Sequence, residues 1–141
     1  MYHYRKTRQH YKKLNKADKE KDGCPFCRDL SGEIVAESAT MVVIPNRVSY
    51  DFFEGRSVLD HLMIIPKRHA ESIHDFTEQE KLDMMDFAGE YETRGYNVYA
   101  RGAGSITRSV KHQHTHLIKV DDTKRAKFIF HLQKPYILIN K

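Results

Sequence analysis

Three histidines alternate along one short stretch of the chain, HQHTHLI at residues 112–118, where His112, His114 and His116 are separated by single residues. Successive side chains of a strand point to opposite faces, so a strand over His112–Val120 would direct all three imidazoles to one face. Imidazole at neutral pH is a nucleophile, a proton carrier and a metal ligand. The row therefore predicts covalent phosphoryl-type chemistry or metal binding. The plainer alternative is a polar face on an edge strand, but such faces are ordinarily built from Thr, Lys and Glu.

The chain has two cysteines, Cys24 and Cys27, in the sequence CPFC. Their spacing suits the chelation of one tetrahedral zinc ion, which needs two more nitrogen or sulfur ligands. A redox C-x-x-C pair normally opens a helix after a βα unit, and nothing before Cys24 resembles a strand. The pair therefore predicts a zinc site, with two unmetallated thiols as the alternative.

The elements that must position these residues are mostly short strands. Apolar and β-branched runs bounded by turn residues predict strands over Glu33–Ala36, Thr40–Ile44, Val58–Ile65, Tyr96–Ala100, His112–Val120, Ala126–Leu132 and Tyr136–Asn140. Thr77 and Glu80 form a capping box before a helical apolar pattern that Gly95 closes. Links of hairpin length favour an antiparallel sheet. The predicted fold class is α+β, with about five or more strands, Val58–Ile65 central among them, and one main helix packed on a face.

The composition indicates a single folded domain. The chain has 141 residues, of which 40% are hydrophobic and 30% charged, which excludes disordered and collagen-like classes. Its apolar runs are far shorter than the roughly 18 residues of a membrane helix. The first residues are polar and basic, with no secretory signal, so a cytoplasmic location is expected.

The net charge of +5 is concentrated at the start of the chain. Residues 1–22 carry 8 Lys and Arg against 3 Asp and Glu, and the remainder holds equal numbers of both signs. Aromatic residues and histidines interleave with these cations, and no apolar stripe recurs. We predict a flexible basic arm over 1–22, followed by one domain over 23–141 with a C-terminal β-hairpin extension. The arm is either a solvated terminus or a weak contact for nucleic acid or polyphosphate.

The triad and its surroundings resemble the histidine-triad (HIT) family of nucleotide hydrolases and transferases. The family signature, H-x-H-x-H and two apolar residues, reads HQHTHLI here. Further blocks follow in the family's order and spacing from Cys24 to Ile118, namely CPFC, GEIVAES, MVVIPNR, HLMIIPKRH and IHDFTEQE. The resemblance implies a HIT-like sheet and, together with the apolar residues of the helix and strands, a homodimer.

The resemblance also implies roles for individual residues. His114 would attack the α-phosphorus of a nucleotide and carry the nucleotidyl group until water or a second substrate releases it. His61 and His116 would orient His114. Asn46 would contact the nucleotide, and Ser109 would hydrogen-bond the phosphate or the leaving group. Backbone N–H groups of the loop before Ser109 could cradle the phosphate oxygens.

In the zinc-containing branch of the family, the histidine after Pro-Lys-x and the first triad histidine complete the metal site. By this resemblance His69 and His112 would join Cys24 and Cys27 around a structural zinc. The remaining histidines follow no such pattern: His3, His10, His74 and His131.

The chain departs from the family pattern near the phosphate site. Arg108 stands four positions before His112, where the family usually has Gln, and Arg101 stands eleven before it, where related members carry Asn or Gln. Guanidinium groups bind phosphate bidentately, so both arginines are predicted nucleotide-binding residues that favour a more anionic substrate. The alternative is that they face solvent. Gln113 and Thr115 replace apolar residues, so the reverse face of the strand would be partly wet or differently packed.

Together these observations predict an enzyme. We expect a nucleotide-binding hydrolase or nucleotidyltransferase that cleaves at the α-phosphate of a phosphoramidate, dinucleoside polyphosphate or nucleotide conjugate through a covalent nucleotidyl-histidine. A non-catalytic nucleotide-binding protein, and a nucleic-acid-associated factor that uses the basic arm, are the alternatives.

Overall fold

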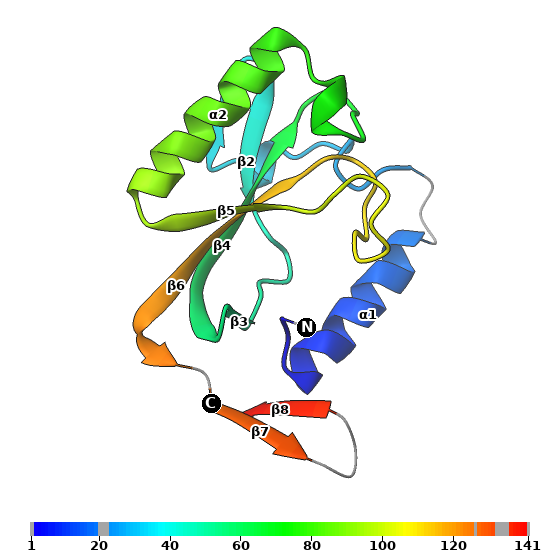
Figure 1. Cartoon of the computed structure of the whole chain (residues 1–141). Helices are drawn as coiled ribbons and strands as arrows, with labels where there is room; N and C mark the ends of the chain where they lie inside the picture. Colours follow the sequence, from blue (N-terminus) through cyan, green and yellow to red (C-terminus); the bar gives the residue numbers. More distant parts are fainter. Residues whose placement is uncertain (1, 20–22, 126, 132–135, 141) are drawn as a thin grey trace.

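The computed structural model describes residues 2–19, 23–125, 127–131 and 136–140 and shows a sheet between two helices (Figure 1). Its elements are helices α1 (Arg5–Lys19) and α2 (Glu78–Thr93), 3-10 helices η1 (Ser31–Glu33) and η2 (Ile73–Asp75), and strands β1 (Ala36–Glu37), β2 (Met41–Pro45), β3 (Phe52–Phe53), β4 (Arg56–Pro66), β5 (Tyr96–Ala100), β6 (Thr115–Arg125), β7 (Lys127–His131) and β8 (Tyr136–Asn140). Among the helices so described, none combines the length and the apolar character that crossing a membrane requires.

Six strands form one antiparallel sheet in the order β1-β2-β4-β6-β5, with β3 paired to β4. The run predicted over Val58–Ile65 is the middle strand, β4, and the run over Tyr96–Ala100 is the edge strand β5. The predicted antiparallel α+β fold with one main helix on a face is confirmed.

Strand β4 changes register twice against β6, both times within residues 56–60. Each irregularity has the character of a β-bulge, which bends the strand and increases its twist. From Asp60 onward the pairing is regular and places His61 opposite Ile118 and Met63 opposite His116. The regular pairing that begins at Asp60 thus determines to which face of the sheet His61 points.

The triad strand begins later than the sequence predicts. Strand β6 starts at Thr115, so His112 and His114 precede it rather than belonging to it. Thr115, the first residue of β6, is paired on both sides, with Ile64 of β4 and Ala100 of β5. Before it the backbone N–H of Gln113 donates to the carbonyl of Ala70 instead, at 2.7 Å. Strand β5 also ends here, at Ala100, whereas β4 continues to Pro66.

Helix α2 covers one face of the sheet (Figure 1). Its predicted capping box is present: Thr77 Oγ1 accepts from the N–H of Glu80, and the Glu80 carboxylate accepts from the N–H of Thr77. Tyr91 and Ala88 of the helix are buried against a cluster that includes Leu62. The other members of this core cluster are Met41, Val43, Ile64, Ala70, Phe76, Tyr96 and Leu117.

His116 of the triad lies on the opposite face of the sheet. Leu117 lies in the cluster under α2, so its neighbour His116 points to the other face, with Met63. Gln113 and Thr115, on the α2 side, are only 2% exposed, and Gln113 Nε2 donates to Thr115 Oγ1 at 3.4 Å. The reverse face is therefore differently packed rather than wet.

The two ends of the chain form elements outside the six-stranded sheet. Residues 5–19, where the sequence predicts an arm without regular structure, form helix α1 on the side of the sheet away from α2 (Figure 1). Strands β7 and β8 pair antiparallel in a separate sheet, in the place of the predicted terminal hairpin. The joining residues 132–135, and the predicted strand limits Ala126 and Leu132, lie outside the described residues. Whether the arm is mobile, and whether 23–141 is one domain, stay predictions.

Asp83 of α2 joins the helix to the β1–β2 turn. Its carboxylate accepts hydrogen bonds from Ser38 Oγ at 2.6 Å, from Thr40 Oγ1 and N–H at 2.7 and 3.0 Å, and from Gln79 Nε2 at 2.6 Å. These hydrogen bonds, that from Ser38 first, hold the pKa of the Asp83 carboxyl below its usual range. The ionised form is therefore favoured in the folded protein.

We expect Asp83→Asn to lower the urea midpoint of unfolding at pH 7, because an amide has one acceptor oxygen for four donors. The loss should shrink below about pH 4, where the carboxyl of the unfolded chain is protonated and the ionic advantage declines. Asp86→Asn, an exposed change on the same helix, is the control and should leave the midpoint unchanged. Equal midpoints for wild type and Asp83→Asn would contradict the assigned role.

Candidate active site

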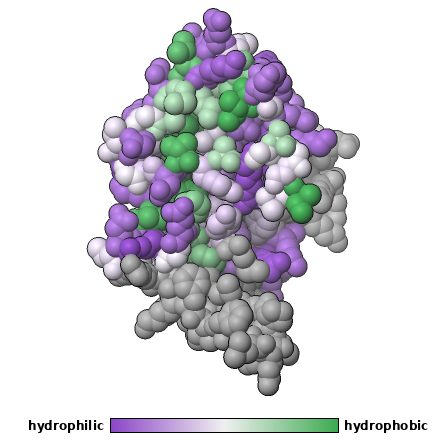
Figure 2. Space-filling model, in the orientation of Figure 1, coloured by the Kyte–Doolittle hydropathy of each residue, from purple (hydrophilic) through white to green (hydrophobic). Residues whose placement is uncertain are grey.

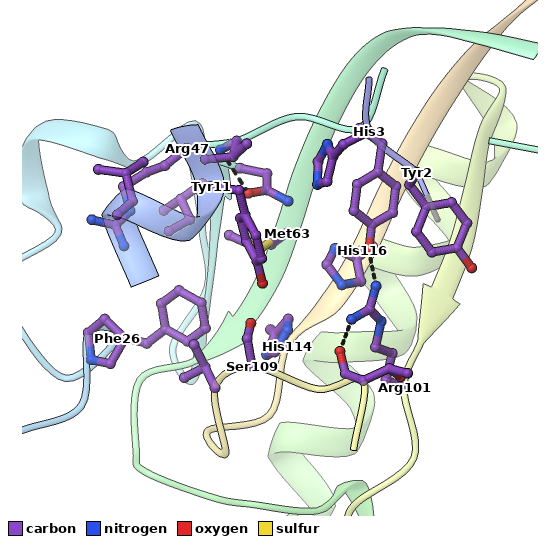
Figure 3. Close-up of a pocket in the computed structure, with 18 of the residues that line it drawn as sticks. Tyr2, His3, Tyr11, Phe26, Arg47, Met63, Arg101, Ser109, His114 and His116 are labelled. Atoms are coloured by element: carbon purple, nitrogen blue, oxygen red, sulfur yellow. Dashed lines mark hydrogen bonds between the residues drawn. The ribbon is translucent and has the colours of Figure 1, made fainter. Parts of the chain in front are cut away.

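A cleft of about 600 Å³ lies on the face of the sheet away from α2. Its walls come from the N-terminal segment, the segment after Cys24, the loop after β2, strand β4 and the segment from Arg101 to His116. Figure 3 shows the side chains that surround it. Residues that line it include Tyr2, His3, Tyr11, Phe26, Asn46, Tyr50, Met63, Arg101, Ser109, His114 and His116.

His61 and His116 form a hydrogen-bonded pair beside this cleft. The backbone N–H of Tyr50 donates to Nδ1 of His61 at 3.0 Å, so the proton of neutral His61 lies on Nε2. That nitrogen is 2.9 Å from Nδ1 of His116 and donates to it. The proton of His116 is consequently on Nε2, which is buried and is without a hydrogen-bond partner among the described residues. One backbone group thus fixes the tautomers of both rings.

His114 is oriented by the main chain. Its Nδ1 lies 2.8 Å from the carbonyl oxygen of His112, and a carbonyl only accepts, so Nδ1 carries the proton. Nε2 of neutral His114 then keeps a lone pair. The His114 ring packs edge to face against His116 at 5.1 Å between centroids and against Phe26 at 5.3 Å. This tautomer is the one a nitrogen nucleophile requires.

Burial keeps these imidazoles neutral. It lowers the pKa of His61 to about 3 and that of His116 to about 2; His3 lowers the pKa of His61 further, and His114 and His61 lower that of His116 further. Burial is also the main cause that lowers the pKa of His114, which Arg108 and Arg101 reinforce. At neutral pH all three rings are therefore uncharged, and the lone pair of His114 is available.

Asn46 and Ser109 both line the cleft. The side-chain nitrogen of Asn46 lies 3.2 Å from Nε2 of His61, and its Oδ1 accepts from the N–H of Val48 at 3.2 Å. Ser109 is exposed, and its hydroxyl lies next to the His114 ring (Figure 3).

The two predicted phosphate-site arginines occupy different places. Arg101 lines the cleft, donates to the carbonyl of Thr107 and to the hydroxyl of Tyr50 at 2.8 Å, and leaves its buried Nε without a partner among the described residues. Arg108 does not line this cleft. It donates to the backbone carbonyls of residues 71, 110 and 111 and so braces the loop before the triad. The structure therefore brings Arg101 to the cleft but not Arg108.

Cys24, Cys27, His69 and His112 lie together in what we call the ligand group. One ligand atom from each is within 4.8 Å of every other. Nδ1 of His112 is 3.4 Å from both sulfur atoms, and Nδ1 of His69 is 3.2 Å from Sγ of Cys27. The group is close enough to bind a metal ion.

The donor set also fits a tetrahedral ion. Ligand bonds of about 2.3 Å to sulfur and 2.0–2.1 Å to nitrogen place sulfur and nitrogen about 3.6 Å apart, near the distances found here. Nε2 of His112 donates to the carbonyl of Pro66 at 2.9 Å, which leaves Nδ1 free of protons and directed to the sulfurs. Nε2 of His69 is 3.9 Å from the Glu71 carboxylate. Carbonyl and carboxylate partners of this kind orient metal-binding histidines.

Several cleft residues were not foreseen from the sequence. Tyr50 fixes His61, covers its ring at 4.4 Å between centroids and holds Arg101, yet the loop 46–57 that contains it shows no pattern. Burial raises the pKa of Tyr50 to about 12, so its hydroxyl stays protonated. Tyr2, His3 and Tyr11 also line the cleft, and their interleaving with cations in the leader was the one available signal.

The sequence was compared with protein families and with curated proteins. No family model matches the sequence. The curated adenosine 5'-monophosphoramidase HNT1 of Saccharomyces cerevisiae is 29% identical over 106 residues, which are 72% of this chain and 65% of that protein, so the chain spans somewhat less than two thirds of this relative's length.

Solved structures share the fold. A histidine triad nucleotide-binding protein from Candida albicans matches with a TM-score of 0.52 at 19% identity, covering 81% of this chain and 87% of that one. A HIT family hydrolase from Legionella pneumophila matches with a TM-score of 0.51 at 19% identity, covering 72% of this chain and 96% of that one. The chain shares the fold of HIT-family proteins. Its HQHTHLI stretch supplies the cleft with His114 and His116 and the ligand group with His112.

The buried histidine pair predicts a pH-dependent stability for this protein. Below pH 6.5 the unfolded chain binds protons at residues 61 and 116 that the folded protein excludes, so stability is lost as the pH falls. Each histidine should cost about 2 kcal/mol between pH 6.5 and 4.5. Urea unfolding of His116→Gln should show a loss over this range smaller by about that amount. His74→Gln, which changes an exposed ring, should keep the wild-type loss. Identical pH slopes for wild type and His116→Gln would refute the assignment.

Proposed function

We propose that this protein is a nucleotide hydrolase or nucleotidyltransferase that cleaves at the α-phosphate through a nucleotidyl-His114 intermediate. The observation that carries the proposal is the orientation of His114, whose Nδ1–H is held by the carbonyl of His112 so that Nε2 keeps its lone pair in the cleft. The phosphoramidase activity in the name of the yeast relative supports the same reaction class.

The reaction has two displacements. Nε2 of His114 attacks the α-phosphorus, a P–N bond forms, and the bond to the leaving group breaks with its electron pair on the leaving group, which takes up a proton. Water, or an acceptor substrate, then attacks the same phosphorus, gives up a proton, and the P–N bond breaks to restore neutral His114. The His112 carbonyl stabilises the charge that develops on the ring during the first displacement.

Other cleft residues would bind and orient the substrate. The unpartnered N–H of His116 and the unpartnered Nε–H of Arg101 supply two donors for phosphate oxygens, and Ser109 supplies a hydroxyl. Asn46 would contact the nucleotide beside His61. Arg101 favours a substrate with additional negative charge, whereas Arg108 would act by holding the loop.

We further propose that the ligand group holds a structural zinc ion. Cys24, Cys27, His69 and His112 would bind it, with the two thiols as thiolates. When bound, the ion would tie the segment after residue 23 to the loops before β6 and contribute folding free energy. Because the ion would hold His112 in place, the carbonyl of His112 would in turn position His114.

The homodimer also stays a proposal, with support from exposed apolar side chains. Leu82 and Met85 of α2 are 60% and 65% exposed, and Val98 of the edge strand β5 is 43% exposed. Figure 2 shows apolar side chains among the polar ones over the part of the molecule where α2 lies. A symmetric partner could cover the helix and pair with the sheet edge.

The nucleophile assignment predicts that His114→Ala abolishes turnover while nucleotide binding largely survives. Loss of the attacking nitrogen should reduce kcat for adenosine 5'-monophosphoramidate by on the order of 10⁴ or more. Mass spectrometry of acid-quenched wild type should detect one added nucleotidyl group, absent from the variant. His74→Ala serves as the matched histidine control with unchanged kcat. Substantial turnover by His114→Ala would exclude the covalent route, and binding without turnover in wild type would leave a nucleotide-binding protein.

The zinc assignment predicts about one zinc per chain in protein prepared without chelator. Cys24→Ser combined with Cys27→Ser should remove the metal and lower the unfolding temperature, because structural zinc contributes folding free energy. Elemental analysis and thermal unfolding measure the two effects, with His74→Ala as the control that retains both. A zinc content near zero in wild type would overturn the proposal.

A further inference from the structure

The N-terminal segment, residues 2–14, forms a wall of the cleft that contains His114. Five of its side chains line the cavity: Tyr2, His3, Arg8, Tyr11 and Leu14. In Figure 3 Tyr11 lies above Ser109 and His114, whereas Tyr2 and His3 lie on the side of His116 and Arg101. A substrate in this cleft would therefore meet residues from the start of the chain.

Asp51 holds this segment in place. Its carboxylate accepts from the backbone N–H of Tyr4 at 2.7 Å and from the hydroxyl of Thr7 at 3.1 Å, and its own N–H donates to the carbonyl of Tyr2 at 2.8 Å. The carboxylate stands at the N-terminus of α1, where negative charge is favourable. The Tyr2 ring also stacks on Tyr50, with 4.5 Å between centroids. The docked position thus rests on contacts with the same loop that fixes His61.

Tyr11 occupies the junction between two cavities. Besides the cleft it lines a second cavity that extends over the loop before β6 toward His69 and His112, and Ser109 lines both cavities as well. In Figure 3 the hydroxyl of Tyr11 points down from α1 toward Ser109 and His114. His3 packs on the Tyr11 ring at 5.5 Å between centroids and restricts it from one side.

We propose that the hydroxyl of Tyr11 donates a hydrogen bond to the reacting phosphate of the substrate, opposite Ser109. This inference rests on the proposed function, since it requires a nucleotide phosphate at His114. A phenol O–H is a good donor to a phosphate oxygen, and donors on both sides of the phosphorus stabilise the charge that shifts onto those oxygens during displacement. Helix α1 is then part of the substrate site rather than a tail beside it.

The test removes only this hydroxyl. Tyr11→Phe should lower kcat/KM for adenosine 5'-monophosphoramidate by ten- to a hundredfold, the range of one hydrogen bond to a charged group. Tyr4→Phe, the same chemical change in the same segment but lining neither cavity, should stay within twofold of wild type. Wild-type kcat/KM in Tyr11→Phe overturns the inference. A wild-type protein that neither binds adenosine 5'-monophosphate nor turns over the phosphoramidate overturns the proposed function instead.

A double-mutant cycle of Tyr11 with Asp51 tests whether the hydroxyl acts only when the N-terminal segment is docked. Asp51→Ala should release the segment and lower kcat/KM, and adding Tyr11→Phe in that background should then cost less than twofold. The same pair of variants should show equal circular dichroism and equal zinc content to wild type, which separates undocking from unfolding. Full additivity of the two losses would mean that the hydroxyl acts independently of the docked helix, and would overturn the inference.

Discussion

The arrangement of the site depends on the dual use of one residue, His112. Its imidazole Nδ1 faces the two cysteine sulfurs, its Nε2–H donates to the carbonyl of Pro66, and its own carbonyl accepts a hydrogen bond from Nδ1–H of His114. Side chain and main chain of a single residue thus connect the ligand group with the ring that keeps a reactive lone pair. Because His112 is fully buried and precedes strand β6, these hydrogen bonds and the ligand group, rather than the sheet ladder, determine where His114 lies.

The sheet separates two kinds of interior. Under α2 the alternating residues of β2, β4 and β6 form an apolar core. Apolar side chains can be buried there if they pack closely, because they need no hydrogen-bond partners. On the opposite face, histidines are equally buried. Their burial is tolerated because most of their ring nitrogens are hydrogen-bonded, in a chain that runs from the Tyr50 N–H through His61 to His116. The atoms left without partners in the described residues belong to His3, Arg101 and His116, and all three residues line the cleft. Donors of this kind favour an anionic ligand.

Local patterns predicted a large part of this structure. The capping box at Thr77 predicted helix α2, and the apolar run before Pro66 predicted the central strand. The alternation of the triad histidines predicted that His114 and His116 lie on one face. The strand start at His112 was wrong because β5 ends at Ala100, opposite Thr115, and Gln113 pairs with Ala70 instead, neither of which β6 itself encodes. Helix α1 was missed because it has no apolar stripe; its docking partners, Tyr50 and Asp51, lie more than 40 residues away. The different uses of Arg101 and Arg108 were not predicted either, because only their hydrogen-bond partners distinguish them: the Tyr50 hydroxyl for Arg101, and backbone carbonyls of residues 71, 110 and 111 for Arg108.

The irregular pairing of β4 near residues 56–60 has a consequence for how this protein can vary. The register of β4 against β6 is re-established at Asp60, immediately before His61. A strand with continuous pairing would pass any insertion in the preceding loop on to every later residue, and a one-residue slip would turn His61 to the opposite face. Here the irregular segment can absorb such a change, with exposed Leu59 inside it. The hairpin formed by β3 and the start of β4 can therefore gain or lose residues over evolutionary time while the histidine pair keeps its alignment.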